Sequence, residues 1–190
     1  MTAAQQPRFE HVHEGDLSLA DHEAVAAMLA QAFESYDHWY LGARSWAGMQ
    51  PERRVLARDD DGRVLAHAGL RRQFVRVGDD ELLLTSVGMV AVSPRAQGTG
   101  LGGRLLAEVD LALAGLGTGF GLLETGEAVK GFYRHAGWLP LDGFTGHFTA
   151  FSAEGAGVLV TQGEGWLLRE VRASRDEWPA GDLHVDGQIV

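Results

Sequence analysis

A glycine-rich loop that joins an apolar run to a helical pattern constrains this chain more than any other stretch. The stretch reads VGMVAVSPRAQGTGLGGRLL and extends from Val87 to Leu106. The apolar run ends at Val92, and after the glycines apolar residues recur at every fourth position from Leu101 to Leu113. Glycines let backbone N–H groups turn toward a ligand, and a helix N-terminus favours negative charge. The order of strand, glycine loop and helix therefore predicts an anion site.

Two common phosphate-binding motifs fit this loop poorly. A nucleotide P-loop ends in Gly-Lys-Ser/Thr, and the only lysine of the sequence, Lys130, lies far from the loop. Gly98, Gly100 and Gly103 do give the G-x-G-x-x-G of a dinucleotide fingerprint. That fingerprint begins where a strand ends, near the start of a βαβ domain, whereas Ser93–Gln97 intervene here. A turn without a ligand is also disfavoured, because glycines entering a helix lower its propensity without improving packing.

The segment QGTGLG, from Gln97 to Gly102, matches a third motif, Q/R-x-x-G-x-G/A, at every defined position. It resembles the loop of the GCN5-related N-acetyltransferase (GNAT) superfamily, which holds the pyrophosphate of coenzyme A. The resemblance implies acetyl-coenzyme A as the acyl donor. Backbone groups of the preceding strand can pair with the pantetheine arm and supply an N–H to the oxyanion. The cofactor-binding residues so implied are Val90, Ala91, Val92, Gln97, Gly98, Thr99, Gly100, Leu101, Gly102 and Gly103.

Composition limits the class of protein. The 190 residues suit one domain with a sizeable core, and 45% hydrophobic with 22% charged residues is typical of a globular protein. The absence of cysteine excludes disulfides and thiolate metal sites, and no spacing of histidines and carboxylates suggests a metal. We expect a cytoplasmic protein, because no apolar run could span a bilayer and the N-terminus is polar. The net charge of −10 disfavours nucleic acid and membrane partners and suits a cationic small-molecule amine; a homodimer stays open.

Periodicity and turn signals predict the order of elements along the chain. Strands are expected over 9–12, 53–58, 63–77, 81–92, 120–125, 148–151, 158–161 and 166–171, and helices over 18–33, 100–113 and 127–136. This order resembles that of GNAT proteins. It implies an α+β fold with a mixed, mostly antiparallel central sheet, a splayed parallel strand pair and flanking helices. We expect a single GNAT domain over residues 1–190, in which 173–190 is an acidic C-terminal tail without a core-forming period.

A second motif, Phe132-Tyr133 followed by Gly137-Trp138, resembles the F-Y-x-x-x-G-[FW] helix end of the same superfamily. The tyrosine there commonly protonates the departing thiolate of coenzyme A, so the resemblance implies a catalytic role for Tyr133. An ordinary tyrosine pKa near 10 exceeds a thiol pKa near 8.5, so this transfer needs a lowered tyrosine pKa or a stabilised phenolate. A buried packing tyrosine is the alternative.

The residues leave the general base open. Glu124 lies near the end of the strand predicted over 120–125, and a carboxylate at an apolar strand end has a raised pKa suited to drawing a proton from the amine through water. A structural hydrogen-bond acceptor is an equal alternative for Glu124. His67 falls in mid-strand, where we favour a core histidine with satisfied nitrogens.

Further segments narrow the resemblance to two branches of the superfamily. Ser45-Trp46-Ala47-Gly48 and Trp178-Pro179 resemble the rhizobial nodulation N-acyltransferases, which acylate the free amine of a chito-oligosaccharide from an acyl carrier protein. The ending Gly181-Asp182 resembles the aminoglycoside 2′-N-acetyltransferases, in which a C-terminal acid and an aromatic residue contact the antibiotic. Asp182 matches the acid, and His184 stands where the aromatic would be. Trp46 belongs to an aromatic stretch that either covers the edge of the core or lines an acceptor pocket.

The leading hypothesis is an acetyl-coenzyme A-dependent N-acetyltransferase that acts on a primary amine of an amino sugar or aminoglycoside-like compound. Tyr133 and Glu124 are its catalytic candidates, and Asp182, His184 and Trp46 its substrate-binding candidates. One alternative is a longer-chain N-acyltransferase resembling the nodulation family. The complete glycine loop, which nodulation enzymes look to have lost in part, favours a coenzyme A donor over a carrier protein. Another alternative is a non-catalytic sensor that binds acyl-coenzyme A.

Overall fold

Two long strands, β3 (Val64–Val77) and β4 (Asp80–Val92), each contribute to both of the units into which the chain divides. The computed structural model describes residues 6–151 and 157–189. The first unit comprises Met1–Leu70 and Met89–Ala112, and the second comprises Arg71–Gly88 and Leu113–Val190. The chain passes from one unit to the other in the middle of regular elements. The single GNAT domain over residues 1–190 stays a prediction.

The first unit holds antiparallel strands and two helices. β1 (Arg8–His13) pairs with β2 (Arg53–Arg58), and β2 pairs with the first part of β3. The other elements are η1 (Glu14–Asp16), α1 (Leu19–Ala32), η2 (Glu34–Trp39), η3 (Pro94–Ala96) and the first part of α2 (Leu101–Leu116). Buried apolar residues from the strands and both helices form its core, among them Val25, Leu29, Val55, Leu56, Leu105 and Val109.

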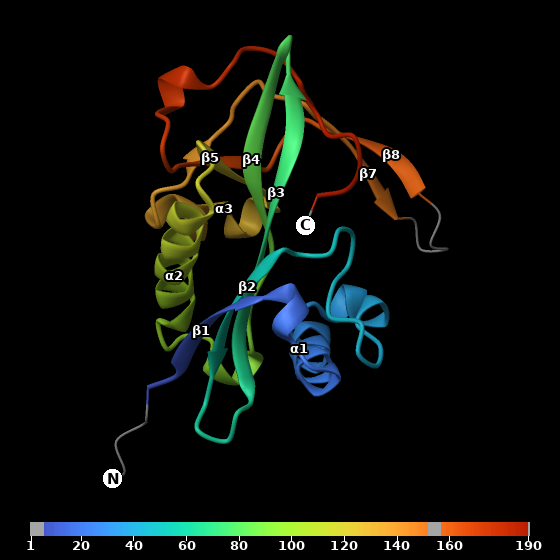
Figure 1. The fold of residues 1–190 in the computed structure, drawn as a ribbon, viewed down its shortest axis with the longest axis vertical. Coiled ribbons are helices and arrows are strands. Elements are labelled where there is room, and N and C mark those ends of the chain that lie inside the picture. Colours follow the sequence, from blue (N-terminus) through green and yellow to red (C-terminus); the bar gives the residue numbers. More distant parts are fainter. Residues whose placement is uncertain (1–5, 152–156, 190) are drawn as a thin grey trace. The chain divides into compact units, whose positions relative to one another are not determined.

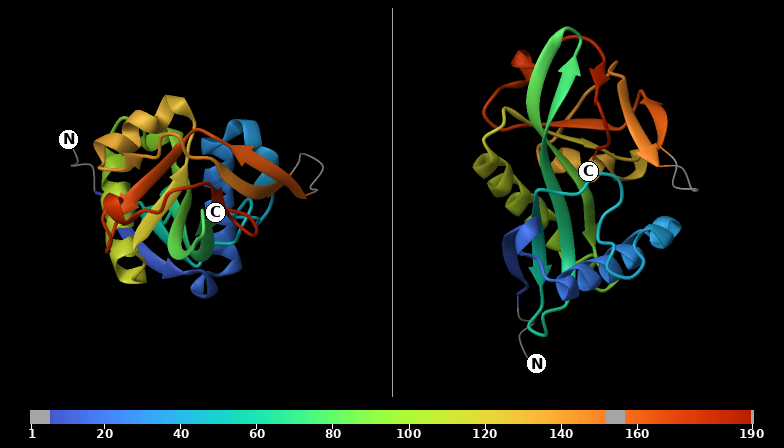
Figure 2. Two further views of the ribbon diagram at one scale, coloured as in Figure 1. Left: turned by 90° about the horizontal axis from the view of Figure 1, so that it is seen from above. Right: turned by 45° about the vertical axis from the view of Figure 1, so that its right-hand side comes forward.

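Alternate residues of β1 contact the two helices, because successive side chains of a strand point to opposite faces. Phe9 lies beneath the guanidinium of Arg104 on α2, 5.2 Å from ring centre to Cζ, and His11 Nε2 is 2.7 Å from the Glu108 carboxylate on the same helix. Glu10, between them in sequence, bonds instead toward α1 through an arginine of β2. α1 and the first part of α2 therefore cover opposite faces of the strands (Figures 1 and 2).

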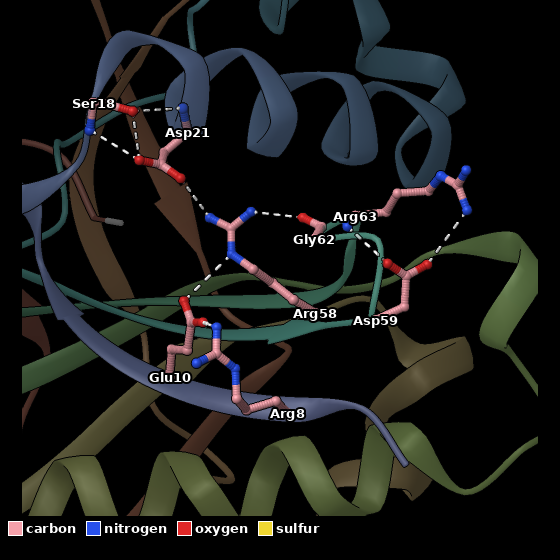
Figure 3. Close-up of polar contacts among 8 residues, drawn as sticks. All are labelled: Arg8, Glu10, Ser18, Asp21, Arg58, Asp59, Gly62 and Arg63. Carbon is pink, nitrogen blue, oxygen red and sulfur yellow. Dashed lines mark hydrogen bonds and ion pairs between the residues drawn. The ribbon is translucent and has the colours of Figure 1, made fainter. Parts of the chain in front are cut away.

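The start of α1 is fixed by a capping box. The N–H of Asp21 donates to the hydroxyl of Ser18 at 3.2 Å, and the N–H of Ser18 donates to the Asp21 carboxylate at 3.0 Å. Arg58 joins this cap to the strands, since it donates to Asp21 at 2.8 Å and to Glu10 at 3.3 Å (Figure 3). The hydrogen bonds from Ser18, aided by the charge of Arg58, lower the pKa of Asp21 below its ordinary value.

The second unit holds the sheet order β6-β9-β5-β4-β3-β10-β7-β8. Its further elements are β5 (Phe120–Glu124), α3 (Glu127–His135), β6 (Leu139–Pro140), β7 (Gly146–Phe151), β8 (Gly157–Gln162), β9 (Trp166–Glu170), η4 (Arg175–Glu177) and β10 (Leu183–His184). β5 is parallel to β4, as expected for strands joined by a helix crossover. The parallel pairing joins Thr85 to Gly121 and Ser86 to Leu122, after which both strands continue. The predicted α+β fold with a mixed sheet is confirmed.

The C-terminal segment contributes to a core that its sequence does not suggest. It shows no core-forming period over 173–190, yet Trp178, Leu183 and Val185 are buried in the core of the second unit. Leu183 lies in β10, a two-residue strand between β3 and β7. A strand of this length is too short to show a period, so only its tertiary pairing reveals it. None of the described helices is both long and apolar enough to cross a membrane.

Candidate active site

The glycine loop follows β4 in the first unit, and short-range hydrogen bonds fix its shape. The N–H of Ser93 donates to a carbonyl of β3 at 2.8 Å, and the N–H of Ala96 donates to Ser93 O at 2.8 Å. The side-chain amide of Gln97 donates to Val92 O at 3.2 Å, and the hydroxyl of Thr99 donates to Ala96 O at 2.6 Å. The side chains of Gln97 and Thr99 thus hold the loop rather than packing in the core.

The loop glycines leave open space at the start of α2. Gly98 and Gly100 have φ angles of 75° and 81°, a region that side-chain-bearing residues rarely adopt. A Cβ added to Gly98, Gly100 or Gly103 would have no neighbouring atom within 4 Å. Leu101, buried at 3% exposure, anchors the first turn of α2, whose leading N–H groups have no intrahelical acceptor. Open space, positive φ angles and free helix donors together fit a bound anion.

The strand before the loop carries the residues expected to face the donor's pantetheine arm. Ala91 is buried, whereas Val90 and Val92 are half-buried, so their side chains belong partly to the core. Their predicted role depends on backbone groups, which side-chain packing does not occupy. The residue before them, Met89, has a φ angle of 49°, which the sequence does not suggest.

Tyr133 lies near the end of α3 in the second unit, buried at 8% exposure. Its ring makes edge contacts with Phe132 and Trp138, at centroid distances of 5.1 and 6.2 Å. Burial raises the pKa of Tyr133 to about 12, opposite to the lowering that easy proton transfer would require. The hydroxyl therefore stays protonated at neutral pH and can donate a hydrogen bond. Full transfer to a thiolate with an ordinary pKa near 8.5 is uphill.

Glu124 occupies the predicted place at the end of β5. The residue is exposed, yet the protein around its carboxylate raises the pKa of Glu124 above its ordinary value through desolvation. A Cβ on Gly165, which has a φ angle of 88°, would lie 2.9 Å from Glu124 Oε1. A glycine at 165 therefore makes room for this carboxylate. The direction of the predicted pKa shift is confirmed, and the role as a base stays a prediction.

The structure brings Asp182 and His184 together with a residue that the sequence did not suggest, His147. β10 pairs parallel with β7, which places His184 opposite His147. The two imidazole rings stack with centroids 4.6 Å apart and an angle of 11°. His147 Nε2 lies 3.6 Å from Asp182 Oδ2, and His147 Nδ1 lies 3.2 Å from the hydroxyl of Thr161. No sequence motif links His147 to His184, because their proximity depends on a pairing between distant strands.

Trp46, the remaining acceptor candidate, belongs to the first unit. It is half-buried, and its ring meets the edge of His22 at a centroid distance of 5.8 Å. His22 Nδ1 in turn lies 2.7 Å from the hydroxyl of Ser45. Trp46 thus packs against a histidine that is itself fixed by a polar contact. Among residues 6–151 and 157–189, no group of three or more histidines and carboxylates is placed to hold a metal ion.

The strand and helix order, with the glycine loop at the start of α2, defines a protein with the GNAT fold. The YhbS acetyltransferase of Escherichia coli, solved in complex with CoA, superposes with a TM-score of 0.66 at 16% identity, over 97% of this chain and 92% of that one. A GNAT family acetyltransferase from Brucella melitensis, in complex with acetyl-CoA, gives a TM-score of 0.56 at 20% identity, over 93% of this chain and 94% of that one.

The sequence identifies the family within this fold. Residues 4–145 match the family model of nodulation protein A, and the chain belongs to that family. Nodulation protein A of Methylobacterium nodulans is 34% identical over 140 residues, which are 72% of this chain and 61% of that protein. The protein of that name from Sinorhizobium fredii is 38% identical over 100 residues, 50% of each. The chain spans about half to three fifths of the length of these relatives. The predicted resemblance to GNAT proteins and to their nodulation branch is confirmed.

Proposed function

We propose that this chain is a coenzyme A-dependent N-acyltransferase, which moves an acyl group from a thioester to the primary amine of a small molecule. The observation that carries the proposal is the open glycine loop at the start of α2, in a chain of the nodulation protein A family. The E. coli and B. melitensis proteins of the same fold were solved with CoA and acetyl-CoA, which supports a donor of this kind.

The loop residues fit the diphosphate of such a donor. Gly98 and Gly100 would let backbone N–H groups approach it, and the first turn of α2 would add its dipole. The backbone of Val90–Val92 would pair with the pantetheine arm and donate an N–H to the thioester carbonyl. The acyl thioester supplies the electrophilic carbonyl carbon, and this chain supplies donors and proton acceptors.

Acyl transfer forms a C–N bond, breaks a C–S bond and removes one proton from the amine, while sulfur leaves as a thiolate that then takes up a proton from water. Glu124, whose pKa is raised by desolvation, would accept the proton of the amine through water. Tyr133, held neutral by burial, would donate a hydrogen bond to the departing sulfur. A donated hydrogen bond stabilises the thiolate without requiring complete ionisation of the phenol. This division of roles agrees with the direction of both pKa shifts.

Family membership favours a longer acyl chain over acetyl, so the longer-chain alternative replaces acetyl transfer as the leading hypothesis. For the acceptor we propose an amino sugar with a free amine. Asp182, with His147 and His184 beside it, and Trp46 are the proposed contacts. The net charge of −10 supports a cationic acceptor and disfavours nucleic acid and membrane partners, whose exclusion stays a prediction. A cytoplasmic location and a homodimer stay predictions.

The proposal is tested by a donor and acceptor screen scored by free-thiol release. Donors are acetyl-, octanoyl- and palmitoyl-coenzyme A and an acyl carrier protein loaded with palmitate. Acceptors are a chito-oligosaccharide with one free amine, an aminoglycoside and a neutral aromatic amine. We expect amine-dependent thiol release that is fastest with a long acyl-coenzyme A and the chito-oligosaccharide. Faster acetyl transfer would restore the acetyltransferase hypothesis, and donor binding without turnover on every amine would favour the sensor.

A further inference from the structure

Arg54 of β2 is a fully buried cation in the first unit, and every one of its N–H groups has a partner. Nε and Nη2 donate to the two carboxylate oxygens of Glu14, and Nη2 also donates to the hydroxyl of Ser45 at 2.9 Å. Nη1 donates to Ser45 O at 2.9 Å and to His67 Nε2 at 3.0 Å. A guanidinium has five N–H donors, so these five contacts saturate it. A buried group bonded in this way has one orientation, and it fixes the groups it contacts.

The contact with Arg54 determines which nitrogen of His67 carries the proton. An arginine can only donate, so His67 Nε2 must accept, and the proton of the neutral ring is on Nδ1. Nδ1 lies 2.8 Å from Met89 O and donates to it. His67 is 0% exposed, and burial, together with the charge of Arg54, lowers the pKa of His67 to about 3. The ring therefore keeps this single tautomer at neutral pH.

Met89, whose carbonyl His67 binds, is the one non-glycine residue with a positive φ angle in the part of the chain that the structure describes. Such a backbone conformation persists only where surrounding contacts determine it, and it occurs most often at functional sites. A trans peptide is planar, so the C=O of Met89 and the N–H of Val90 point in opposite directions. By holding the Met89 carbonyl, His67 therefore also sets the direction of the Val90 N–H.

We propose that Glu14, Arg54 and His67 form a positioning relay, which rotates the Met89–Val90 peptide so that the Val90 N–H faces the carbonyl of the donor's thioester. This inference rests on the proposed acyltransferase function and assigns His67 as a positioning residue, since it acts through the backbone of β4. An N–H aimed in advance at a developing oxyanion stabilises the transition state without reorganisation. The relay explains why the first unit buries a charged residue in mid-strand, where an apolar residue would pack at lower cost.

Asparagine and leucine have nearly the same shape, so substituting each of them for His67 distinguishes the relay from a role in packing. In His67→Asn the side-chain amide can replace Nδ1 as the donor to Met89 O, whereas His67→Leu removes that donor. Both variants leave the same Arg54 N–H without its acceptor, so they share any loss of stability from that group. Thermal unfolding of both variants measures that shared loss.

The test measures kcat with a saturating acyl-coenzyme A, and the dissociation constant of free coenzyme A, which has no thioester carbonyl. We expect His67→Leu to lower kcat about ten- to a hundredfold, since removal of an oxyanion donor costs about 10² to 10³ in kcat and a misdirected donor costs less. His67→Asn should stay within about threefold of wild type, and coenzyme A affinity should be unchanged in both. Equal kcat values for the two variants would overturn the relay.

The amide resonance of Val90 distinguishes failure of the relay from failure of the proposed function. A wild-type protein without turnover on any amine would overturn the proposed function alone. The ¹H–¹⁵N resonance of Val90 then judges the relay, because it reports the orientation and hydrogen bonding of that N–H. A shift in His67→Leu that His67→Asn does not show supports the relay. The same position of the Val90 resonance in wild type and His67→Leu overturns it.

Discussion

A buried histidine of the first unit and a pair of histidines in the second are held in opposite ways. In the first unit, His67 is inaccessible to water, and both ring nitrogens bond to protein atoms, at 2.8 and 3.0 Å. In the second unit, His147 and His184 are partly exposed, stack on each other, and lie beside an exposed carboxylate, Asp182. The first arrangement has no capacity left for a ligand and can only position other groups. The second keeps polar atoms accessible to a solute.

Two tyrosines, one in each unit, can be compared in the same way, because they are buried to nearly the same extent. Tyr40 in the first unit and Tyr133 in the second are 6% and 8% exposed, and burial raises the pKa of each to about 12. Tyr40 stacks on Phe33 at a centroid distance of 6.1 Å, whereas Tyr133 lies in a helix whose sequence resembles a catalytic motif. We infer that the glycine loop serves donor binding, and that Tyr133 serves the chemical step. Substitutions in the loop should then change donor affinity, whereas substitution of Tyr133 should change kcat.

Gly100→Glu should have the largest effect. The side chain would enter the open space at the start of α2 and repel the donor's diphosphate, so we expect affinity for acyl-coenzyme A to fall more than about a hundredfold by calorimetry. Gly62→Glu is a matched control, because Gly62 also has a positive φ angle, 78°, with no atom near its missing Cβ. Normal donor affinity in Gly100→Glu would remove the diphosphate from this loop.

Tyr133→Phe should lower kcat about ten- to a thousandfold and leave donor affinity nearly unchanged. General acid–base contributions are typically about 10² to 10⁴, and water can replace part of the effect. Tyr40→Phe makes the same chemical change at an equally buried site and should leave kcat near wild type. If the two variants behave alike, Tyr133 has a packing role.

The lowered pKa of His67, a residue of the first unit, should make the folded protein less stable in acid. Its pKa rises from about 3 in the folded protein to its ordinary 6.5 on unfolding, so the unfolded chain binds the extra proton. The stabilisation is complete above about pH 6.5 and decreases as pH falls toward 3, by about 1.4 kcal/mol per pH unit. The free energy of unfolding, measured by urea denaturation, should therefore decrease between pH 7 and pH 5 by about 2 kcal/mol less in His67→Asn than in wild type.

A His147→Asn variant is the control for that measurement, because it changes an accessible histidine of the second unit. The difference between the two variants isolates the part of the pH dependence that requires a buried ring. A wild-type slope in His67→Asn would mean that the His67 ring is not held in its neutral form.

Asp182→Asn should have the smallest effect, and only on the acceptor. We expect KM for a cationic amino sugar to rise about two- to fivefold while the donor KM stays constant, since an exposed charge pair contributes about 0.2 to 1 kcal/mol. The effect should shrink between 0.1 and 1 M salt, as the screening length falls from about 10 Å to about 3 Å. Asp176→Asn removes the same charge from an exposed site elsewhere in the C-terminal segment and is the matched control. An acceptor KM that both variants raise equally would reflect net charge alone.

A C-terminal truncation would not test the role of Asp182. Deleting 181–190 would remove Leu183 and Val185 from the core of the second unit, and with them β10, which pairs with two other strands. A truncated chain would therefore lose acceptor kinetics through unfolding, whatever the role of Asp182.

The sequence by itself determined the elements whose signals are local. The capping box at Ser18, the crossover that makes β5 parallel to β4, and the glycine loop before α2 follow from neighbouring residues and from short-range geometry. The motif around Tyr133 and the place of Glu124 at a strand end were also readable, because both depend on an element's own sequence. The direction of the pKa shift of Glu124 was readable too, whereas the raised pKa of Tyr133 was not, since its desolvation depends on which distant residues cover it.

Tertiary structure alone decided what depends on contacts between distant segments. The five acceptor atoms around Arg54 belong to three residues from distant stretches of the chain, Glu14, Ser45 and His67. The stacking of His147 on His184 requires β7 and β10 to pair. A two-residue strand such as β10 has no period, so burial of Leu183 is invisible in the sequence. The positive φ angle of Met89 likewise has no sequence signal, and the hydrogen bond from His67 to its carbonyl joins two different strands. Local patterns specify where groups occur along the chain, and only long-range packing specifies which of them meet and how they are ionised.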